Sequence, residues 1–250
     1  AQLFMTYETA CFDIKAASVA QKLWAVGVRH KATFRADPMA GNAMVKAVIA
    51  DAVALDTPSE QKVPITNTTL AFLKSALDTQ SRSGFTLWTG VRFAIAFLCR
   101  ISEWAWNDKY SVKWKHISFF ETNTQGLKVK MRVRSMADLQ DITQMQVIFF
   151  SDKTAKPGES KARTFHAIPD RSNTKCIVRD MARLWLISEK VQDCHCFSWA
   201  SDTAGVTRTL INKALKAAAV ATGIPGADVS SHSLRCTGLS RLLAAKPNPM

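Results

Sequence analysis

The sequence predicts a mostly α-helical protein that also carries a small antiparallel β-sheet. Residues 15–54 are rich in alanine and place apolar side chains at helical spacing. Residues 86–104 are apolar nearly all round, as expected of a helix buried in the centre of a domain. Four later segments have the residue types and the alternation of β-strands. These segments are residues 113–120, 127–134, 145–154 and 162–168.

The order of these patterns predicts two domains. Residues 1–56 form the helical N-terminal domain, and residues 66–250 form a mixed α+β domain. Residues 57–65 contain two prolines and several polar residues, which favours a linker. Thr66 then has the side chain and the position of an N-cap for a helix that begins directly after it.

The strongest strand pattern is residues 127–134, LKVKMRVR. Because side chains alternate across a strand, one face would carry four apolar residues and the other four basic ones. We therefore expect the apolar face to pack on the core and the basic face to line a cationic surface. Amphipathic helices should follow at 176–190 and 206–221, and a last helix at 231–245, capped by Ser230 or Ser231.

The charge balance is the first functional indication. Lys and Arg number 33 against 20 Asp and Glu, which gives a formal net charge of +13. A folded protein this basic attracts polyanions, because each neutralised phosphate releases condensed counterions. The excess is spread along the chain, which favours a folded nucleic-acid-binding surface, although an ordinary basic surface is the alternative.

Composition also excludes several classes of protein. Apolar residues make up 47% of the chain, which argues against intrinsic disorder. The apolar run 93–98 is interrupted by Arg92 and Arg100, so we expect no membrane span, and the N-terminus has no secretory pattern. Six dispersed cysteines predict reduced thiols in an intracellular protein. Residues 193–196, Asp-Cys-His-Cys, could contribute to a zinc site, but no second ligand pair is evident, so a loop with buried thiols is favoured.

Three short motifs carry the candidate chemistry. Arg100 and Glu103 follow the most buried helix, where an arginine is costly unless it faces an anion or a carboxylate. Lys153 lies in SDKTAKPG, the expected tip of a β-hairpin. His232 and Arg235 are three residues apart at the start of the last helix and should project from one face.

The order and spacing of these motifs resemble the tyrosine recombinases, the phage-integrase-like enzymes that cut and rejoin DNA. That family carries an R-x-x-E-like first motif, a lysine on a hairpin and a later H-x-x-R motif. The resemblance covers most of the chain. Residues 1–56 would match the helical, SAM-like core-binding domain, and residues 66–250 the integrase-like catalytic domain. The run from KAASVAQKLWAVGVRHKATFRADPM through KVPIT is also similar to recombinases of DIRS-type mobile elements.

The resemblance implies a role for each residue. Arg100 and Arg235 would clamp the phosphate oxygens, where negative charge grows in the transition state, with bidentate hydrogen bonds that lysine cannot reproduce. Lys153 would protonate the leaving 5′-oxygen, His232 would assist proton transfer, and Glu103 would hold Arg100 in place. The reaction needs no metal or other cofactor. The implied partner is double-stranded DNA, with self-association on DNA, in the nucleus of a eukaryote or the nucleoid or cytoplasm of a bacterium or phage host.

Each role has a structural alternative. Arg100 and Glu103 could be a structural pair, His232 could merely cap its helix, and Lys156 and Lys161 lie in the same hairpin as Lys153. The tryptophans and phenylalanines are better explained as core residues than as base-stacking platforms.

The family's nucleophile is a tyrosine a few turns beyond the H-x-x-R motif. The two tyrosines of the chain, Tyr7 and Tyr110, match neither that position nor its surroundings. We therefore expect the given residues to lack the nucleophile and to bind DNA without cleaving it. The alternatives are a non-catalytic DNA-binding relative of the recombinases and an unrelated basic helical module.

Overall fold

The computed structural model describes residues 16–35, 46, 47, 50, 62–106, 110–150, 160–170, 176–188, 191–200 and 202–245. The chain divides into two compact units, residues 1–60 and 61–250. In the first unit, helix α2 spans Ala16–Phe34, within the stretch that the alanine-rich pattern predicts to be helical. Of the expected linker, residues 57–61 lie outside the described residues. In the described part of the chain, no helix is long and apolar enough to cross a membrane.

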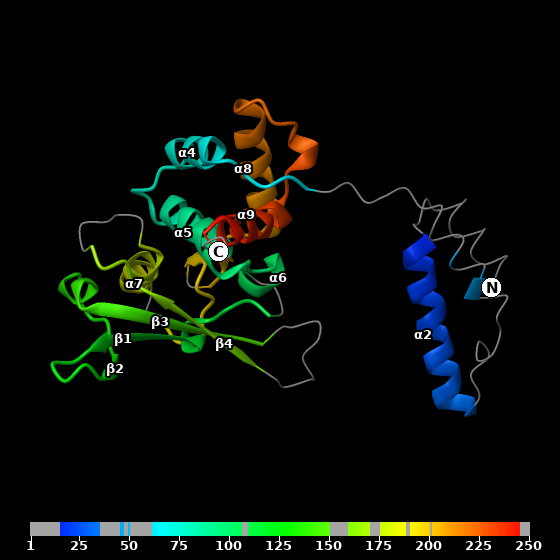
Figure 1. The fold of residues 1–250 in the computed structure, drawn as a ribbon, viewed down its shortest axis with the longest axis horizontal. Helices are drawn as coiled ribbons and strands as arrows, with labels where there is room; N and C mark the ends of the chain where they lie inside the picture. The colour runs from blue at the N-terminus through cyan, green and yellow to red at the C-terminus, as the bar shows by residue number, and fades with distance from the viewer. Residues whose placement is uncertain are drawn as a thin grey trace, which may run out of the picture. The chain divides into compact units, whose positions relative to one another are not determined.

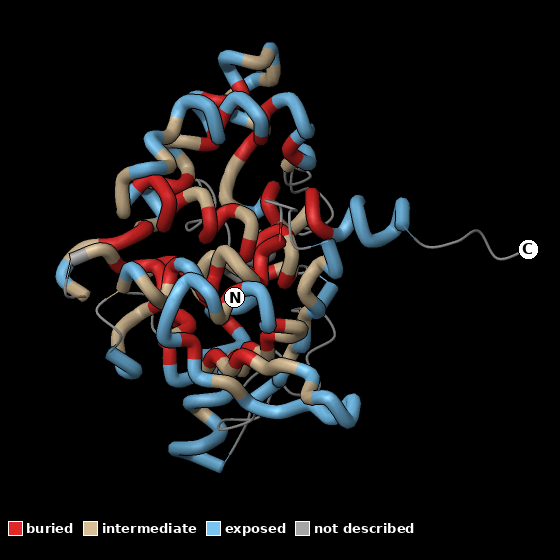
Figure 2. The backbone as a smooth tube through the Cα atoms, turned by 90° about the vertical axis from the view of Figure 1, so that its left-hand side faces the viewer, coloured by how far each residue is buried: buried red, intermediate tan, exposed pale blue. Residues whose placement is uncertain are grey.

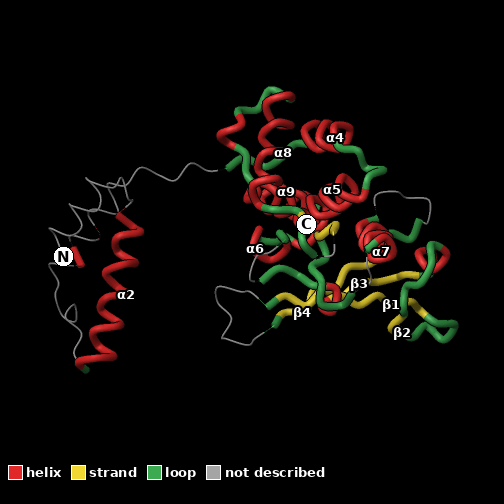
Figure 3. The backbone as a smooth tube through the Cα atoms, turned by 180° about the vertical axis from the view of Figure 1, so that it is seen from behind, coloured by secondary structure: helices red, strands yellow, loops and turns green. Residues whose placement is uncertain are grey.

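The second unit is mostly helical with a small antiparallel sheet, which confirms the predicted class. Helix α5 (Arg82–Phe97) runs through its centre. On one side of α5 lie α4 (Asn67–Ala76), α8 (Arg208–Ala221) and α9 (Ser231–Ala244), and on the other lie the sheet and α7 (Ile177–Ile187) (Figures 1 and 3). Figure 2 shows that the buried segments are concentrated in the interior of this unit.

The sheet has the strand order β2-β1-β3-β4, with every neighbouring pair antiparallel. Its central strands, β1 (Ile117–Thr122) and β3 (Ile142–Phe149), bury alternate residues against the helices. The edge strands are β2 (Lys128–Met131) and β4 (Lys161–His166). A separate two-stranded ribbon pairs β5 (Ser198–Ala200) with β6 (Ala204–Gly205).

The expectation for residues 127–134 is only half right. Val133 is buried and Met131 is half-buried, but Leu127 and Val129 are 59% and 39% exposed. The reason is topological, because β2 is an edge strand, whereas α7 packs against β3, two strands away, and against the 3₁₀ turn η2 (Ala137–Gln140). The apolar face of β2 therefore reaches the core only at its C-terminal end.

The helix predicted over 86–104 is in fact two helices. α5 ends at Phe97, and α6 covers only Ile101–Trp104. Between them Leu98 adopts the left-handed conformation (φ 55°), which is unusual for a residue with a branched side chain. The chain turns there, and this turn sets the direction in which Arg100 and the rest of the first motif leave α5.

Two predicted helix caps are confirmed. The Thr66 hydroxyl accepts a hydrogen bond from the Thr69 N–H (3.1 Å) and begins α4. Of the two serines proposed for the last helix, Ser230 is the cap, and its hydroxyl accepts from the His232 N–H (3.2 Å). Both helix starts are therefore set by residues next to them in the sequence.

The last residues of the expected linker, 62–65, are part of the second unit. Ile65 is buried, and its N–H donates to the Thr237 hydroxyl on α9 at 2.7 Å. The Val63 N–H donates to the Asp228 carbonyl at 3.0 Å. This short segment is thus fixed along α9 and the 3₁₀ turn η3 (Gly226–Asp228) before it.

Candidate functional site

The junction between α5 and α6 holds Arg100. This residue is the N-cap of α6, in extended conformation, and its side chain is 34% exposed. The Cys99 N–H donates to the Ala94 carbonyl at 3.0 Å, which satisfies one of the free carbonyls at the end of α5. Arg100 is therefore attached to the end of a buried helix but keeps part of its guanidinium at the surface.

Glu103 fixes the position of Arg100. Its side chain is only 2% exposed, and its Oε2 accepts a hydrogen bond of 2.6 Å from the Arg100 N–H. The other carboxylate oxygen, Oε1, lies 3.6 Å from Arg100 Nη1. A buried carboxylate is stable only where such partners compensate its lost hydration. The supporting role predicted for Glu103 thus has a geometric counterpart, a contact to both the backbone and the side chain of Arg100.

Arg235 lies on α9, which packs closely on the end of α5. Three residues after it, Gly238 faces α5, where an added Cβ would come within 2.5 Å of Leu98 Cδ2 and closer still to the Ile95 carbonyl oxygen. Residues three apart in a helix share a face, so Arg235 sits one turn from this contact. Its side chain is half-buried.

The buried thiol of Cys99 connects these groups. Burial raises the pKa of Cys99 well above its usual value, and the Glu103 carboxylate raises it further. The guanidiniums of Arg163 and Arg235 lower it. The charges of Glu103, Arg163 and Arg235 thus all influence the thiol of Cys99, which precedes Arg100 in the sequence. We call Arg100, Arg163 and Arg235, with Glu103, the arginine cluster.

Sequence reasoning missed Arg163. It lies on β4 opposite Val147 of β3, on the face of the sheet that packs against the core. There its guanidinium donates to the Phe97 carbonyl and lies 4.8 Å from the centre of the Phe149 ring. A cation at a helix C-terminus is favourable because the last carbonyls carry partial negative charge. The available signal was a basic residue at a core-facing position of a predicted strand.

Among the described residues, no contact between the His232 side chain and the arginine cluster is found. The side chain is exposed, and the hydrogen bond described for this residue is that of its backbone N–H to Ser230. Its position three residues before Arg235 on α9 is as the H-x-x-R spacing predicts. Lys153, with the rest of the expected hairpin tip at 151–158, lies outside the described residues.

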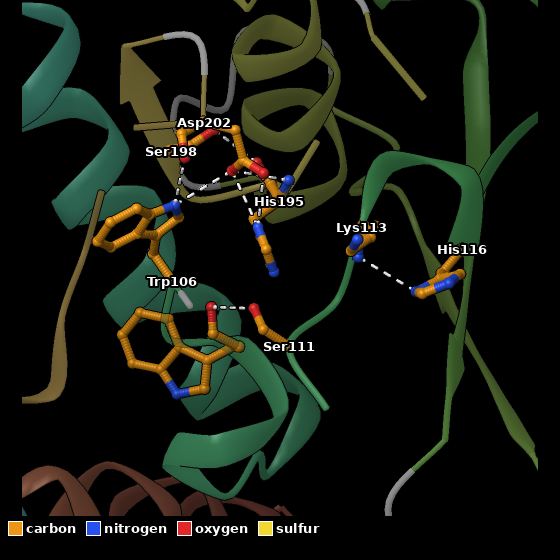
Figure 4. Close-up of polar contacts among 8 residues, drawn as sticks. Trp106, Ser111, Lys113, His116, His195, Ser198 and Asp202 are labelled. Atoms are coloured by element: carbon orange, nitrogen blue, oxygen red, sulfur yellow. Dashed lines mark hydrogen bonds and ion pairs between the residues drawn. The ribbon is translucent and has the colours of Figure 1, made fainter. Parts of the chain in front are cut away.

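Figure 4 shows a second polar group, centred on Asp202 between β5 and β6. Both carboxylate oxygens lie 2.9 Å from His195 Nδ1, and Oδ1 also accepts from the Trp106 indole N–H at 3.1 Å. Because Trp106 lies two residues after the end of α6, these contacts attach the two-stranded ribbon to the chain that follows the first motif. We interpret this group as a structural support of the arginine cluster.

The neighbouring histidine, His116, is held neutral. Its Nδ1 accepts the Lys113 N–H at 3.1 Å (Figure 4). Burial, followed by the charges of Lys115 and Lys113, lowers its pKa. A neutral imidazole is the form that can accept this hydrogen bond.

The Cys-His-Cys segment contributes buried thiols. Cys196 is fully buried, which raises the pKa of its thiol, and Cys194 is half-buried. Across the described residues, no group of three or more His, Cys, Asp or Glu side chains could hold a metal ion.

Comparison with known proteins assigns no family. No protein-family model matches the chain, and no curated protein matches it either.

Proposed function

We propose that this chain binds double-stranded DNA and belongs to the DNA-cutting and DNA-rejoining recombinases or integrases of the tyrosine class. The observation that carries the proposal is the pairing of Arg100 with the buried Glu103 at the junction onto which the helix of Arg235 packs. In this proposal Arg100 and Arg235 grip one backbone phosphate between them.

The chemistry of phosphate supports two arginines for this role. A guanidinium presents two parallel N–H groups to two phosphate oxygens, and its charge strengthens both hydrogen bonds. Glu103 keeps Arg100 oriented before DNA arrives, so less conformational entropy is lost on binding. Arg163 has a different role, because its guanidinium donates a hydrogen bond to the Phe97 carbonyl at the end of α5. In this proposal it holds the junction between α5 and α6 in place.

In the complete reaction, the two arginines would stabilise the charge that develops on the phosphate as a 3′-phosphotyrosyl link forms. Lys153 would donate the proton to the departing 5′-oxygen, and His232 would assist proton transfer. The exposed position of His232 beside Arg235 leaves its imidazole open to a DNA phosphate.

The first test measures DNA binding by the fluorescence anisotropy of a labelled duplex. Arg100→Lys and Arg235→Lys keep the charge but lose the paired N–H groups, and each should weaken binding about tenfold, the equivalent of one charge-assisted hydrogen bond. The Arg100 backbone bond to Glu103 remains in Arg100→Lys, so its fold should be intact.

The matched control is Arg183→Lys, an exposed arginine on α7 whose guanidinium lies over the Phe85 ring. It should bind DNA like the unchanged chain. Affinity should also fall steeply between about 50 and 200 mM salt, because counterions are released on binding. Equal affinities for all three variants, or no dependence on salt, would contradict the proposal.

The second candidate is a DNA-binding protein of the same fold that does not cleave. It takes into account that neither Tyr7 nor Tyr110 matches the position of the family's nucleophile. A nicked duplex that traps covalent protein–DNA adducts separates the two candidates. An adduct that is lost in Tyr110→Phe would identify a nucleophile and refute the second candidate. Specific DNA binding without an adduct is the result that the second candidate requires.

A further inference from the structure

A cavity of about 900 Å³ lies between α4, α5 and α9. A second cavity, of about 830 Å³, lies at the β2 edge of the sheet, opposite the edge that carries Arg163. The second cavity combines aromatic and cationic side chains in one place and lies beside β2, whereas Arg163 lies on β4, the other edge strand. Its lining has no acidic residue. It is formed by Trp114, Lys115, Ile117, Ser118, Phe119, Lys130, Met131, Arg132, Val133, Arg134, Trp185 and Gln192.

The cavity exists because two strands separate. The pairing of β1 with β2 runs as far as Phe119 opposite Met131 and then stops, although the chain continues on both sides. Residues 132–134 diverge from the start of β1, and the Trp185 indole N–H donates to the Val133 carbonyl at 3.2 Å. The tryptophan of α7 thus closes the end of the gap and is held in one orientation.

The floor of the cavity is aromatic and apolar. Trp114 is buried and packs edge-on against Trp185, with ring centres 5.3 Å apart and planes at 64°. Trp185 is itself half-buried. The apolar part of the lining also includes Ile117, Phe119, Met131 and Val133. A planar ring of a ligand in this cavity could therefore stack on Trp185, whose orientation is fixed by its contacts to Val133 and Trp114.

The rim is cationic, and part of its charge is not neutralised. Lys115 pairs with Asp193 at 2.5 Å, and Arg134 lies near Asp138, whose pKa is lowered chiefly by the backbone N–H groups of Arg134 and Ser135. Within the described residues, no carboxylate contacts Lys130 or Arg132, and both side chains are exposed. These two cations are available to an anion at the mouth.

We propose that this cavity binds a nucleotide, with its base against Trp185 and its phosphate at Lys130 and Arg132. Its volume is in the range of small-molecule sites, roughly 300–1,000 Å³. Base–aromatic stacking tolerates any base, and the arginine can hold phosphate through two hydrogen bonds. The nucleotide could be free or an unpaired nucleotide of a DNA strand, and the chemistry of recognition is the same for both. The inference does not depend on the proposed recombinase activity.

Titration calorimetry of the whole chain with deoxyadenosine monophosphate tests the proposal, with deoxyadenosine and inorganic phosphate as separate probes. The monophosphate should bind saturably and at least about tenfold more tightly than either part alone, because it uses both stacking and charge. Absence of saturable binding at millimolar concentration would overturn the proposal. So would equally tight binding of the nucleoside, since the cations would then have no part.

Variants locate the site. Lys130→Gln with Arg132→Gln should weaken binding of the monophosphate about tenfold or more. The matched control, Lys213→Gln with Lys216→Gln, removes two exposed cations from α8 and should leave the affinity unchanged. Equal losses in both double variants would mean a non-specific charge effect and would refute the site.

Trp185 is tested by two substitutions. Trp185→Phe keeps an aromatic face, whereas Trp185→Leu removes it, so affinity should fall further in the leucine variant. If Trp185→Leu fails to fold by circular dichroism, the surface variants Lys130→Gln and Arg132→Gln still decide the question. Finally, a single-stranded oligonucleotide distinguishes the two sources of the nucleotide. A DNA strand is the source if the oligonucleotide binds more tightly than the monophosphate and if this difference disappears in the Lys130→Gln, Arg132→Gln double variant. Equal affinity of the two identifies the free nucleotide.

Discussion

Replacing Gly238 by alanine would push two helices apart. The added Cβ would come within 2.5 Å of Leu98 Cδ2 and nearer still to the Ile95 carbonyl oxygen, where ordinary contacts need well over 3 Å. The leucine side chain can turn away, but a backbone carbonyl in the last turn of α5 cannot. Overpacking of this kind costs about 3 kcal/mol at the upper end of its usual range. Alanine recovers about 1 kcal/mol through its higher helix propensity. The net expectation is a loss of about 2 kcal/mol.

Urea unfolding followed by tryptophan fluorescence suits this measurement, because every tryptophan except Trp24 lies in residues 61–250. Ser240→Ala changes an exposed position of the same helix and should alter the free energy of unfolding by less than about 0.5 kcal/mol. DNA binding by Gly238→Ala should weaken as well, because Arg235 is one turn away. Unchanged or increased stability of Gly238→Ala would refute the close approach of α9 to α5.

Three further predictions concern the surroundings of this contact. Glu103→Gln replaces the carboxylate that accepts the Arg100 N–H by an amide, so urea unfolding should show a loss of about 1–2 kcal/mol, and a more stable variant would contradict the supporting role. Asp180→Ala removes the carboxylate that pairs with the half-buried guanidinium of Arg92 and should cost about 1.5–3 kcal/mol in the same assay, whereas a neutral result would mean that water replaces the carboxylate. Burial raises the pKa of Cys99, so at pH 8 iodoacetamide should modify this residue only in denaturant. Mass spectrometry checks this prediction, and carboxamidomethylated Cys99 in the native protein would contradict it.

Local patterns predicted the parts of the fold that depend on neighbours in sequence. Thr66 and Ser230 cap their helices because a hydroxyl beside a helix start needs only the next turn to satisfy it. The R-x-x-E spacing likewise brought Glu103 to Arg100, since one turn of backbone separates them.

The features that were missed depend on long-range contacts. The register of β4 on β3 places Arg163 opposite Val147, where its guanidinium reaches the Phe97 carbonyl at the end of α5. Neither the register nor the position of α5 can be predicted from residues 162–168 alone. The break at Leu98 has no glycine or proline to announce it. Val129 has the alternation of a core strand but is exposed, because its strand became an edge. Pattern fixes which side of a strand is apolar, whereas the order of strands decides whether that side is covered.

The short segment 62–65 also has a mechanical consequence. The Thr237 hydroxyl accepts from the Ile65 N–H and donates to the Ser233 carbonyl one turn earlier on α9. Thr237 lies only two residues after Arg235. If Arg235 binds an anion as proposed, a small rotation of α9 would be transmitted to Ile65 through this buried hydrogen bond. The bond between the Val63 N–H and the Asp228 carbonyl holds the other end of the segment, so residues 62–65 would couple a movement of α9 to η3.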